Sequence, residues 1–226
     1  MNIDFHSHIL PNADHGSDGL ETTLIQLAMA QHAGIEVLAA TPHFYPRRED
    51  AATFLRRREQ CAALLRRMLP TDAPRLLVGA EVQLCRGLEH LAELEQLCLE
   101  GTRVLLLELP PVRSVKPYEA TLCALTEDCG LTVVLAHIDR YDPKMIEPLL
   151  ENGFLAQLNA DAFLRFWSRR RCLRWAERSC VVALGSDLHG TEQGYRCFDR
   201  ARTLLGSRYD ALMRRTEELL PSRGLM

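Results

Sequence analysis

Two histidines, His6 and His8, are separated by one residue and follow the segment Asn2-Ile3-Asp4-Phe5 near the start of the chain. The segment Asn2–His8 predicts a strand, and residues i and i+2 of a strand point to the same side. Both imidazoles can therefore bind one metal ion from one face. A single pair at this spacing is common by chance, so its meaning depends on what the rest of the chain brings to the same place.

Later predicted strands also end in side chains that can bind a metal ion. In α/β barrels the C-terminal ends of the strands carry the working residues. The candidate ligands at these ends and in the adjoining loops are His6, His8, His15, His43, Glu81, Glu108, His137, Asp187 and His189. Buried carboxylates and imidazoles gathered at one end of a barrel would repel each other or stay unsatisfied without a cation. The sequence therefore predicts a metal cluster.

The donor set also limits which metals fit and how many. It consists of imidazole nitrogens and carboxylate oxygens without a thiolate, which favours manganese, iron or zinc. Nine ligands exceed the four to six that one ion takes, so two or three divalent ions are expected, with a carboxylate such as Glu81 as a bridge. Sites of this kind activate water and bind the attacking and leaving oxygens in phosphoryl transfer. The expected chemistry is metal-assisted hydrolysis of a phosphoester.

The segments that must position these ligands alternate between apolar, β-branched runs and amphipathic helical stretches. The predicted strands are Asn2–His8, Glu36–Thr41, Arg75–Val82, Arg103–Leu109, Leu131–His137, Phe154–Asn159 and Cys180–Ser186. The predicted helices are Leu20–Ala33, Ala51–Met68, Leu88–Leu99, Tyr118–Asp128, Pro143–Asn152, Ala162–Arg178, Tyr195–Leu205 and Tyr209–Leu220. Continuous apolar strands are typical of a parallel sheet that is buried on both faces. Seven βα units predict a seven-stranded (β/α)7 barrel in one domain, residues 1–226, with a doubly wound open sheet as the alternative.

The composition is that of a soluble globular protein, with 226 residues, 47% hydrophobic and 25% charged residues and a net charge of −3. A basic nucleic-acid-binding footprint is not present, so no nucleic-acid partner is expected. No signal peptide is recognisable, and no apolar run reaches the roughly 18 residues of a membrane span. The eight cysteines are scattered without a C-x-x-C pair. We therefore expect a cytoplasmic protein with reduced cysteines and no membrane insertion.

Several motifs together resemble one known superfamily. They are Asp4–Pro11, Asp14-His15-Gly16, Thr41-Pro42-His43, Gly79-Ala80-Glu81, Ala136–Tyr141 and Ser186–His189. This set resembles the polymerase-and-histidinol-phosphatase (PHP) superfamily and, within it, the bacterial capsule-type protein-tyrosine phosphatases of the CpsB/YwqE-like group. The resemblance extends over nearly the whole chain. It implies an α/β fold, a distorted seven-stranded (β/α)7 barrel of the PHP type, and a three-metal site that usually holds manganese.

The resemblance also implies how the ligands are divided among the metals. The first ion takes His6, His8, Glu81 and Asp187, the second takes Glu81, Glu108 and His137, and the third takes His15, His43 and His189. Members of the group often have Asp-Asp-Gly where this chain has Asp14-His15-Gly16. The histidine keeps a ligand but removes a negative charge, which favours zinc or iron more than in those members, so both metals are alternatives to the expected manganese.

By the same resemblance Arg140 contacts the substrate phosphate, and an arginine soon after the S-D-x-H motif does so too. Arg196 is the nearest candidate for that second role, although it lies further along the chain than expected. Arg47 and Arg48, after the second strand, are further candidates at the mouth of the site. The expected mechanism is direct in-line attack of metal-bound hydroxide without a phospho-enzyme, in which His43 can donate a proton to the leaving group.

The resemblance thus implies a metal-dependent protein-tyrosine phosphatase of exopolysaccharide or capsule regulation. Its partner would be the phosphotyrosine C-terminal tail of a bacterial tyrosine kinase. The alternatives are a phosphatase for histidinol phosphate or another small metabolite, and a non-catalytic regulatory module stabilised by metal. Cys61–Arg67 and Cys172–Arg178 match the spacing of a cysteine-phosphatase loop, but they lie in helical patterns without the glycines of a phosphate cradle.

Overall fold

The structure, a computed structural model, describes residues 1–192 and 195–221. Its sheets contain nine strands: β1 (Ile3–Ser7), β2 (Val37–Ala40), β3 (His43–Phe44), β4 (Arg75–Val78), β5 (Glu81–Gln83), β6 (Val104–Glu108), β7 (Thr132–Leu135), β8 (Leu155–Asn159) and β9 (Val181–Gly185). They form a three-stranded sheet in the order β1-β2-β4 and a six-stranded sheet in the order β3-β5-β6-β7-β8-β9. Every pairing is parallel, as the continuous apolar strands predict.

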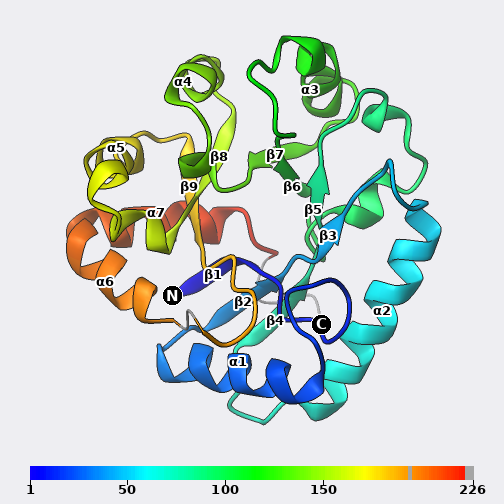
Figure 1. The fold of residues 1–226 in the computed structure, drawn as a ribbon, viewed down its shortest axis with the longest axis vertical. Helices are drawn as coiled ribbons and strands as arrows, with labels where there is room; N and C mark the ends of the chain where they lie inside the picture. Colours follow the sequence, from blue (N-terminus) through cyan, green and yellow to red (C-terminus); the bar gives the residue numbers. More distant parts are fainter. Residues whose placement is uncertain (193–194, 222–226) are drawn as a thin grey trace.

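Helices surround the strands on the outside (Figure 1). The α-helices are α1 (Leu20–His32), α2 (Ala51–Met68), α3 (Glu119–Glu127), α4 (Pro143–Glu151), α5 (Phe166–Ala176), α6 (Arg196–Leu205) and α7 (Ser207–Glu218), and the short 3-10 helices are η1 (Leu88–His90), η2 (Leu94–Leu97), η3 (Lys116–Tyr118), η4 (Ile138–Arg140) and η5 (Ala160–Phe163). Asp50 and Asp142 begin α2 and α4 as N-caps, because each carboxylate accepts a backbone N–H of the first turn. The mixed α/β class and the parallel sheets are as expected.

The expected single seven-stranded barrel is not confirmed, since the predicted strand Arg75–Val82 is interrupted and a further short strand, β3, follows the predicted strand Glu36–Thr41. Thr41 and Pro42 separate β2 from β3, and Gly79 and Ala80 separate β4 from β5. Proline has no N–H to donate to a ladder, and glycine lacks the side chain that holds a strand in place. The described residues therefore contain nine strands in two sheets without one continuous closed ladder.

The two sheets meet at the ends that carry the candidate ligands. The N–H of Asp187, just after β9, donates to the carbonyl of His6 in β1 over 2.8 Å. The N–H of His8 donates to the carbonyl of Leu188 over 3.4 Å. On the other side, β2 runs on into β3 and β4 into β5, where the N–H of Glu81 donates to the carbonyl of Pro42 over 3.1 Å. These contacts bring the C-terminal ends of strands from both sheets to one place.

One predicted helix is wrong. The segment Leu88–Leu99 forms the two 3-10 turns η1 and η2 instead of an α-helix. Its leucines at 88, 91, 94 and 97 recur every third residue. That spacing suits the three residues per turn of a 3-10 helix better than the 3.6 of an α-helix. The remaining predicted helices and strands are present with boundaries shifted by a few residues.

None of the helices in residues 1–192 and 195–221 combines the length and the hydropathy that a bilayer crossing requires.

Candidate metal centre

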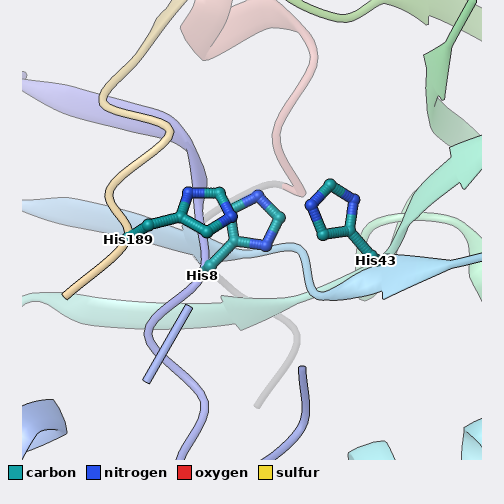
Figure 2. Close-up of side chains that lie close together, drawn as sticks. All are labelled: His8, His43 and His189. Atoms are coloured by element: carbon teal, nitrogen blue, oxygen red, sulfur yellow. The ribbon is translucent and has the colours of Figure 1, made fainter. Parts of the chain in front are cut away.

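Eight of the nine predicted ligands lie close enough together to share metal ions. Four groups, each with one donor atom per residue and all donors within 4.8 Å, are His8/His43/His189, His6/His8/Asp187, His6/Glu81/His137 and His43/Glu81/Glu108. Figure 2 shows the imidazoles of the first group turned toward one another from three separate segments of the chain. Because the groups share members, they form one continuous cluster at the C-terminal ends of the strands.

Glu81 lies at the centre of this cluster. Its Oε1 is 2.6 Å from Nε2 of His137, and its Oε2 is 2.8 Å from Nδ1 of His43. The same Oε2 is 3.3 Å from Nε2 of both His6 and His8. Burial alone would raise the pKa of Glu81, but the surrounding imidazoles, His6 foremost, hold it well below its ordinary value. Glu81 is therefore an ionised carboxylate that is surrounded by four imidazoles able to bind a metal ion.

The outer nitrogens of His6 and His8 are both engaged, which fixes the tautomer of each ring. Nδ1 of His8 is 2.7 Å from the carboxylate of Asp14, and Nδ1 of His6 is 3.2 Å from Oε1 of Gln157. Both partners are acceptors, so both Nδ1 atoms carry hydrogen. In neutral rings the two Nε2 lone pairs then face each other, 3.0 Å apart. Metal-binding histidines are oriented by partners on their outer nitrogen in this way.

Asp187 and His189 complete the cluster from the loop after β9. Asp187 Oδ1 lies 3.2 Å from Nε2 of His8. Nδ1 of His189 is 3.0 Å from the carbonyl of Asp187, so the carbonyl accepts and Nε2 is left without hydrogen. Burial, followed by the charge of His8, lowers the pKa of His189 to about 4. At neutral pH this imidazole is uncharged and its Nε2 lone pair is available to a metal.

Several buried polar atoms of the cluster lack a hydrogen bond, and they show whether the donor set suits a metal ion. Among the described residues, the buried donors and acceptors that make no well-aligned hydrogen bond include Nδ1 of His43, Oε2 of Glu81, Nδ1 of His137, Oδ1 of Asp187 and Nε2 of His189. Oε2 of Glu81 and Nδ1 of His43 lie 2.8 Å apart but are not aligned as a hydrogen bond. Leaving so many polar atoms unpaired in the interior costs about 1–3 kcal/mol each. Divalent metals take imidazole nitrogens and carboxylate oxygens. The donor set therefore fits a multi-metal site.

His15 is the predicted ligand that stands apart from these groups. It is exposed on the loop after β1, and the structure groups His43 and His189 with His8 rather than with His15. Its ring still stacks on that of His43, with centroids 4.9 Å apart and planes 8° apart. Glu108 likewise groups with His43 and Glu81 rather than with His137. The expected division of ligands among three metals stays a prediction.

The candidate phosphate-binding arginines differ in their position. Arg140, on η4, contacts the carboxylate of Asp187 while part of its side chain remains exposed. Arg48 lies over the ring of Tyr45, 4.7 Å from its centroid, and Tyr45 stacks on His43. Arg47 is exposed on the same loop, and Arg196 is exposed at the start of α6. Within residues 1–192 and 195–221, neither Arg47 nor Arg196 makes a hydrogen bond or an ion pair with a residue of the cluster.

Sequence reasoning missed the polar residues that support the ligands. Oε1 of Gln157, on β8, accepts the backbone N–H of His137 over 2.7 Å in addition to its contact with His6. Asn159, two residues further on, donates to Asp187 over 3.1 Å. The signal was present, because both residues interrupt the apolar side of β8 at alternate positions.

Asp4 is a second missed residue, and it lies on β1 two residues before His6. Its carboxylate accepts the N–H and the hydroxyl of Ser186, at 2.8 and 2.6 Å, and the hydroxyl of Tyr195 at 2.7 Å. It therefore ties the first strand to the loop that carries Asp187. An acid between two apolar residues, Ile3 and Phe5, at the start of a buried strand was the available signal.

The backbone is strained where two ligands leave their strands. His137 and Asp187 have φ angles of 32° and 50°, in the left-handed region that non-glycine residues rarely adopt. The N–H of each is held, by Gln157 and by the carbonyl of His6 respectively. Such strain clusters at functional sites, where the surrounding structure maintains it.

The chain is similar in sequence to proteins of one known family. The sequence model of a family described as capsular polysaccharide synthesis, CpsB/CapC, matches residues 2–219. The chain is 25% identical over 229 residues to tyrosine-protein phosphatase CpsB of Streptococcus pneumoniae, covering 92% of this chain and 91% of that protein. It is 23% identical over 212 residues to tyrosine-protein phosphatase CpsB of Streptococcus agalactiae, covering 84% of each.

The fold is also similar to a solved structure. It comes from a study of YwqE from Bacillus subtilis and CpsB from Streptococcus pneumoniae, described there as unique metal-dependent tyrosine phosphatases. The TM-score is 0.81 at 22% identity, and the match covers 96% of this chain and 94% of the other. Since the family model covers nearly the whole sequence, this protein belongs to the CpsB/CapC family of capsular polysaccharide synthesis.

Proposed function

We propose that this protein is a metal-dependent protein-tyrosine phosphatase, a phosphoric monoester hydrolase. The observation that carries the proposal is the buried cluster around Glu81, where imidazoles and carboxylates from both sheets converge and leave polar atoms unpaired. The names of the relatives support the substrate class, because CpsB proteins are tyrosine-protein phosphatases. The two cysteines with the spacing of a cysteine-phosphatase loop, Cys61 and Cys172, offer no alternative nucleophile, since they lie inside α2 and α5.

Two or three divalent ions, with manganese favoured and iron or zinc as alternatives, would be held by the nine predicted ligands. When bound, such ions supply an activated water and positive charge for the phosphoryl oxygens. Glu81 is the bridging ligand that the geometry supports best, because its two oxygens face different imidazoles. Gln157 and Asp14 keep His6 and His8 in the tautomer that presents Nε2 to the cluster.

The chain's own residues bind and orient the phosphate. We infer that the exposed part of Arg140 binds the phosphoryl oxygens, because its contact with Asp187 places the guanidinium at the edge of the cluster. Water attacks phosphorus in line, the bond from phosphorus to the tyrosine oxygen breaks, and tyrosine and inorganic phosphate are released. A phenol of pKa about 10 needs little help to leave. The tyrosine oxygen gains a proton as it leaves, and His43 is the candidate donor of that proton. Among the residues that the structure describes, Arg196 has no contact of the kind that supports Arg140 as a phosphate ligand.

We also propose a protein substrate, a cellular location and a domain organisation. The proposed substrate is the phosphotyrosine tail of a bacterial tyrosine kinase that controls capsule or exopolysaccharide export, in the cytoplasm, without nucleic acid. The whole chain would act as one domain.

We also infer that the nine strands act as seven segments of a distorted barrel. The short breaks at Thr41-Pro42 and Gly79-Ala80, and the hydrogen bonds between β1 and the end of β9, support this inference.

The test compares substrates on metal-reconstituted protein. We expect turnover of a phosphotyrosine peptide that is lost with chelator and in His137→Ala, and little turnover of histidinol phosphate. Preference for histidinol phosphate would replace the tyrosine-phosphatase proposal with a metabolite phosphatase that uses the same cluster. Metal loading without turnover of either substrate would indicate a non-catalytic module. Hydrolysis in heavy-oxygen water should place one solvent oxygen in the phosphate, and its absence would contradict direct attack by water.

A further inference from the structure

Two adjacent aromatic side chains stand almost fully in solvent at the start of α5. Phe166 is 86% exposed and Trp167 is 80% exposed, and Leu164 beside them is 38% exposed. Other large apolar side chains that are exposed, such as Leu64 and Met68 on α2, are less than half accessible. A contiguous apolar patch on a protein surface usually marks a binding site.

This patch belongs to the same edge of the molecule as the metal centre. Its helix follows the C-terminal end of β8 after only the short turn η5, and Asn159 at that strand end donates to Asp187. The guanidinium of Arg171 on α5 donates to the carbonyl of Asp139 over 3.1 Å. Asp139 directly precedes Arg140, the candidate phosphate ligand. The first turns of α5 therefore lie beside the segment that borders the mouth of the site.

The exposed face of α5 is also strongly basic. The segment Leu164–Arg174 contains five arginines and no acidic residue. Arg170 and Arg174 are exposed and follow Phe166 at successive intervals of four residues, which places them on the same face of the helix. The opposite face is buried, with Ser168, Cys172 and Trp175 turned to the interior. Within the described part of the chain, neither Arg170 nor Arg174 forms an ion pair.

We propose that this face, the α5 docking surface (Leu164, Phe166, Trp167, Arg170 and Arg174), binds the polypeptide chain that flanks the phosphotyrosine of the substrate. The occupant is a peptide segment with acidic and apolar or aromatic side chains. Acidic residues complement the unpaired arginines, and apolar residues cover Phe166 and Trp167. The inference rests on the proposed function, because a phosphotyrosine in the metal centre is attached to a chain that must leave across the bordering surface. A lipid bilayer on this face would cover the mouth instead of leaving it open to a protein.

The first test separates peptide binding from phosphoester chemistry. With a phosphotyrosine peptide flanked by glutamate and phenylalanine, Phe166→Ala/Trp167→Ala should raise KM at least tenfold and leave kcat nearly unchanged. Hydrolysis of p-nitrophenyl phosphate, which has no flanking chain, should be unaffected. Leu64→Ala/Met68→Ala on α2 is the matched control, because it removes two exposed apolar side chains away from this edge. An unchanged peptide KM in the α5 variant would overturn the proposal.

The charge of the surface is tested in the same assay. Arg170→Glu/Arg174→Glu should raise KM for the acidic peptide and have a smaller effect on a peptide in which serine replaces the flanking glutamates. An equal effect on both peptides would contradict charge complementarity.

The second test needs no turnover, so it remains informative if the proposed activity fails. The chain has two tryptophans, and Trp175 is only 2% exposed, so a change in fluorescence reports on Trp167. A phosphonate analogue of the acidic peptide should shift the emission to the blue, and the shift should disappear in Trp167→Ala. A shift with anionic phospholipid vesicles but not with the peptide would overturn the proposal in favour of a membrane surface. A shift that appears only on raising the protein concentration would overturn it in favour of self-association.

Discussion

The Nε2 atoms of His6 and His8 lie 3.0 Å apart in the interior, and each ring has its outer nitrogen hydrogen-bonded to an acceptor. In neutral rings this arrangement sets two lone pairs against each other. A cation between them, whether a proton or a metal ion, removes the repulsion. An H-x-H pair can therefore bind one metal ion through both Nε2 atoms only where acceptors on the two Nδ1 atoms orient the rings.

Competition between protons and metal should make the effect of chelation depend on pH. Burial lowers the pKa of His6 and His8, but the neighbouring carboxylates outweigh it and raise both above their ordinary value of about 6.5. In metal-free protein a raised histidine pKa stabilises the fold fully below about pH 6.5, and this stabilisation is lost as the pH rises through the folded-state pKa. Metal replaces those protons. We therefore expect the drop in Tm on adding chelator to grow as the pH rises above about 6.5, as followed by thermal unfolding. A drop that shrinks over this range would contradict the arrangement.

Gln157→Leu should weaken metal binding while the protein stays folded. The substitution removes the acceptor shared by Nδ1 of His6 and the N–H of His137, so both ligands lose the group that orients them. Losses of this kind reduce metal affinity by about 10–100-fold. Titration with Mn²⁺ by calorimetry measures the change. Thr216→Val is the control, since it also removes a buried hydrogen bond, to Val182, but should leave the metal affinity unaltered.

Gly185→Ala should damage both stability and metal binding. A Cβ at this position would lie 2.5 Å from Cβ of His6 and 2.8 Å from Nε2 of Gln157, so the strand carrying His6 would have to shift. Overpacking of this kind costs about 1–3 kcal/mol. Chemical denaturation measures the loss. Gly19→Ala, where nothing lies within 4 Å of the added carbon, should change the free energy of unfolding by less than about 0.5 kcal/mol. Equal effects of the two substitutions would refute the steric argument.

Arg140→Ala should lower kcat/KM for a phosphotyrosine peptide at least tenfold, which corresponds to about 1.4 kcal/mol. The guanidinium borders the cluster through Asp187, and its removal takes away a charge-assisted contact to the phosphate. Arg140→Lys should recover only part of the loss, because an ammonium lacks the planar fork. Arg196→Ala is the matched control, with the same change of charge at an exposed position that makes no ion pair with the cluster in the described part of the chain. A larger effect at Arg196 than at Arg140 would reverse the assignment.

The sequence was informative about the ligands because each follows a strand, and the ends of parallel strands meet. His137 and Asp187 could be placed in this way although 50 positions separate them in numbering. It was less informative about closure of the sheet, since the breaks at Thr41-Pro42 and Gly79-Ala80 leave the apolar pattern of the two segments unchanged. The Leu88–Leu99 segment was misassigned because its leucine spacing of three lies close to that of an α-helix.

The supporting residues were harder to predict than the ligands. Gln157 and Asp4 act through contacts with segments far away in the sequence, and a single polar residue in a strand does not reveal its partner. His15 shows the reverse problem. Its type and motif suit a ligand, but the loop conformation decides whether the ring joins the cluster, and that conformation is set by contacts such as the Gly16 N–H with Asp14.

The most direct test of the central claim is anomalous diffraction from crystals of the protein soaked with MnCl₂. We predict two or three anomalous peaks among the clustered ligands, with Glu81 between two of them, and the loss of at least one peak in Glu81→Gln. A single peak, or peaks only at surface carboxylates remote from Glu81, would contradict a multi-metal centre built around this residue.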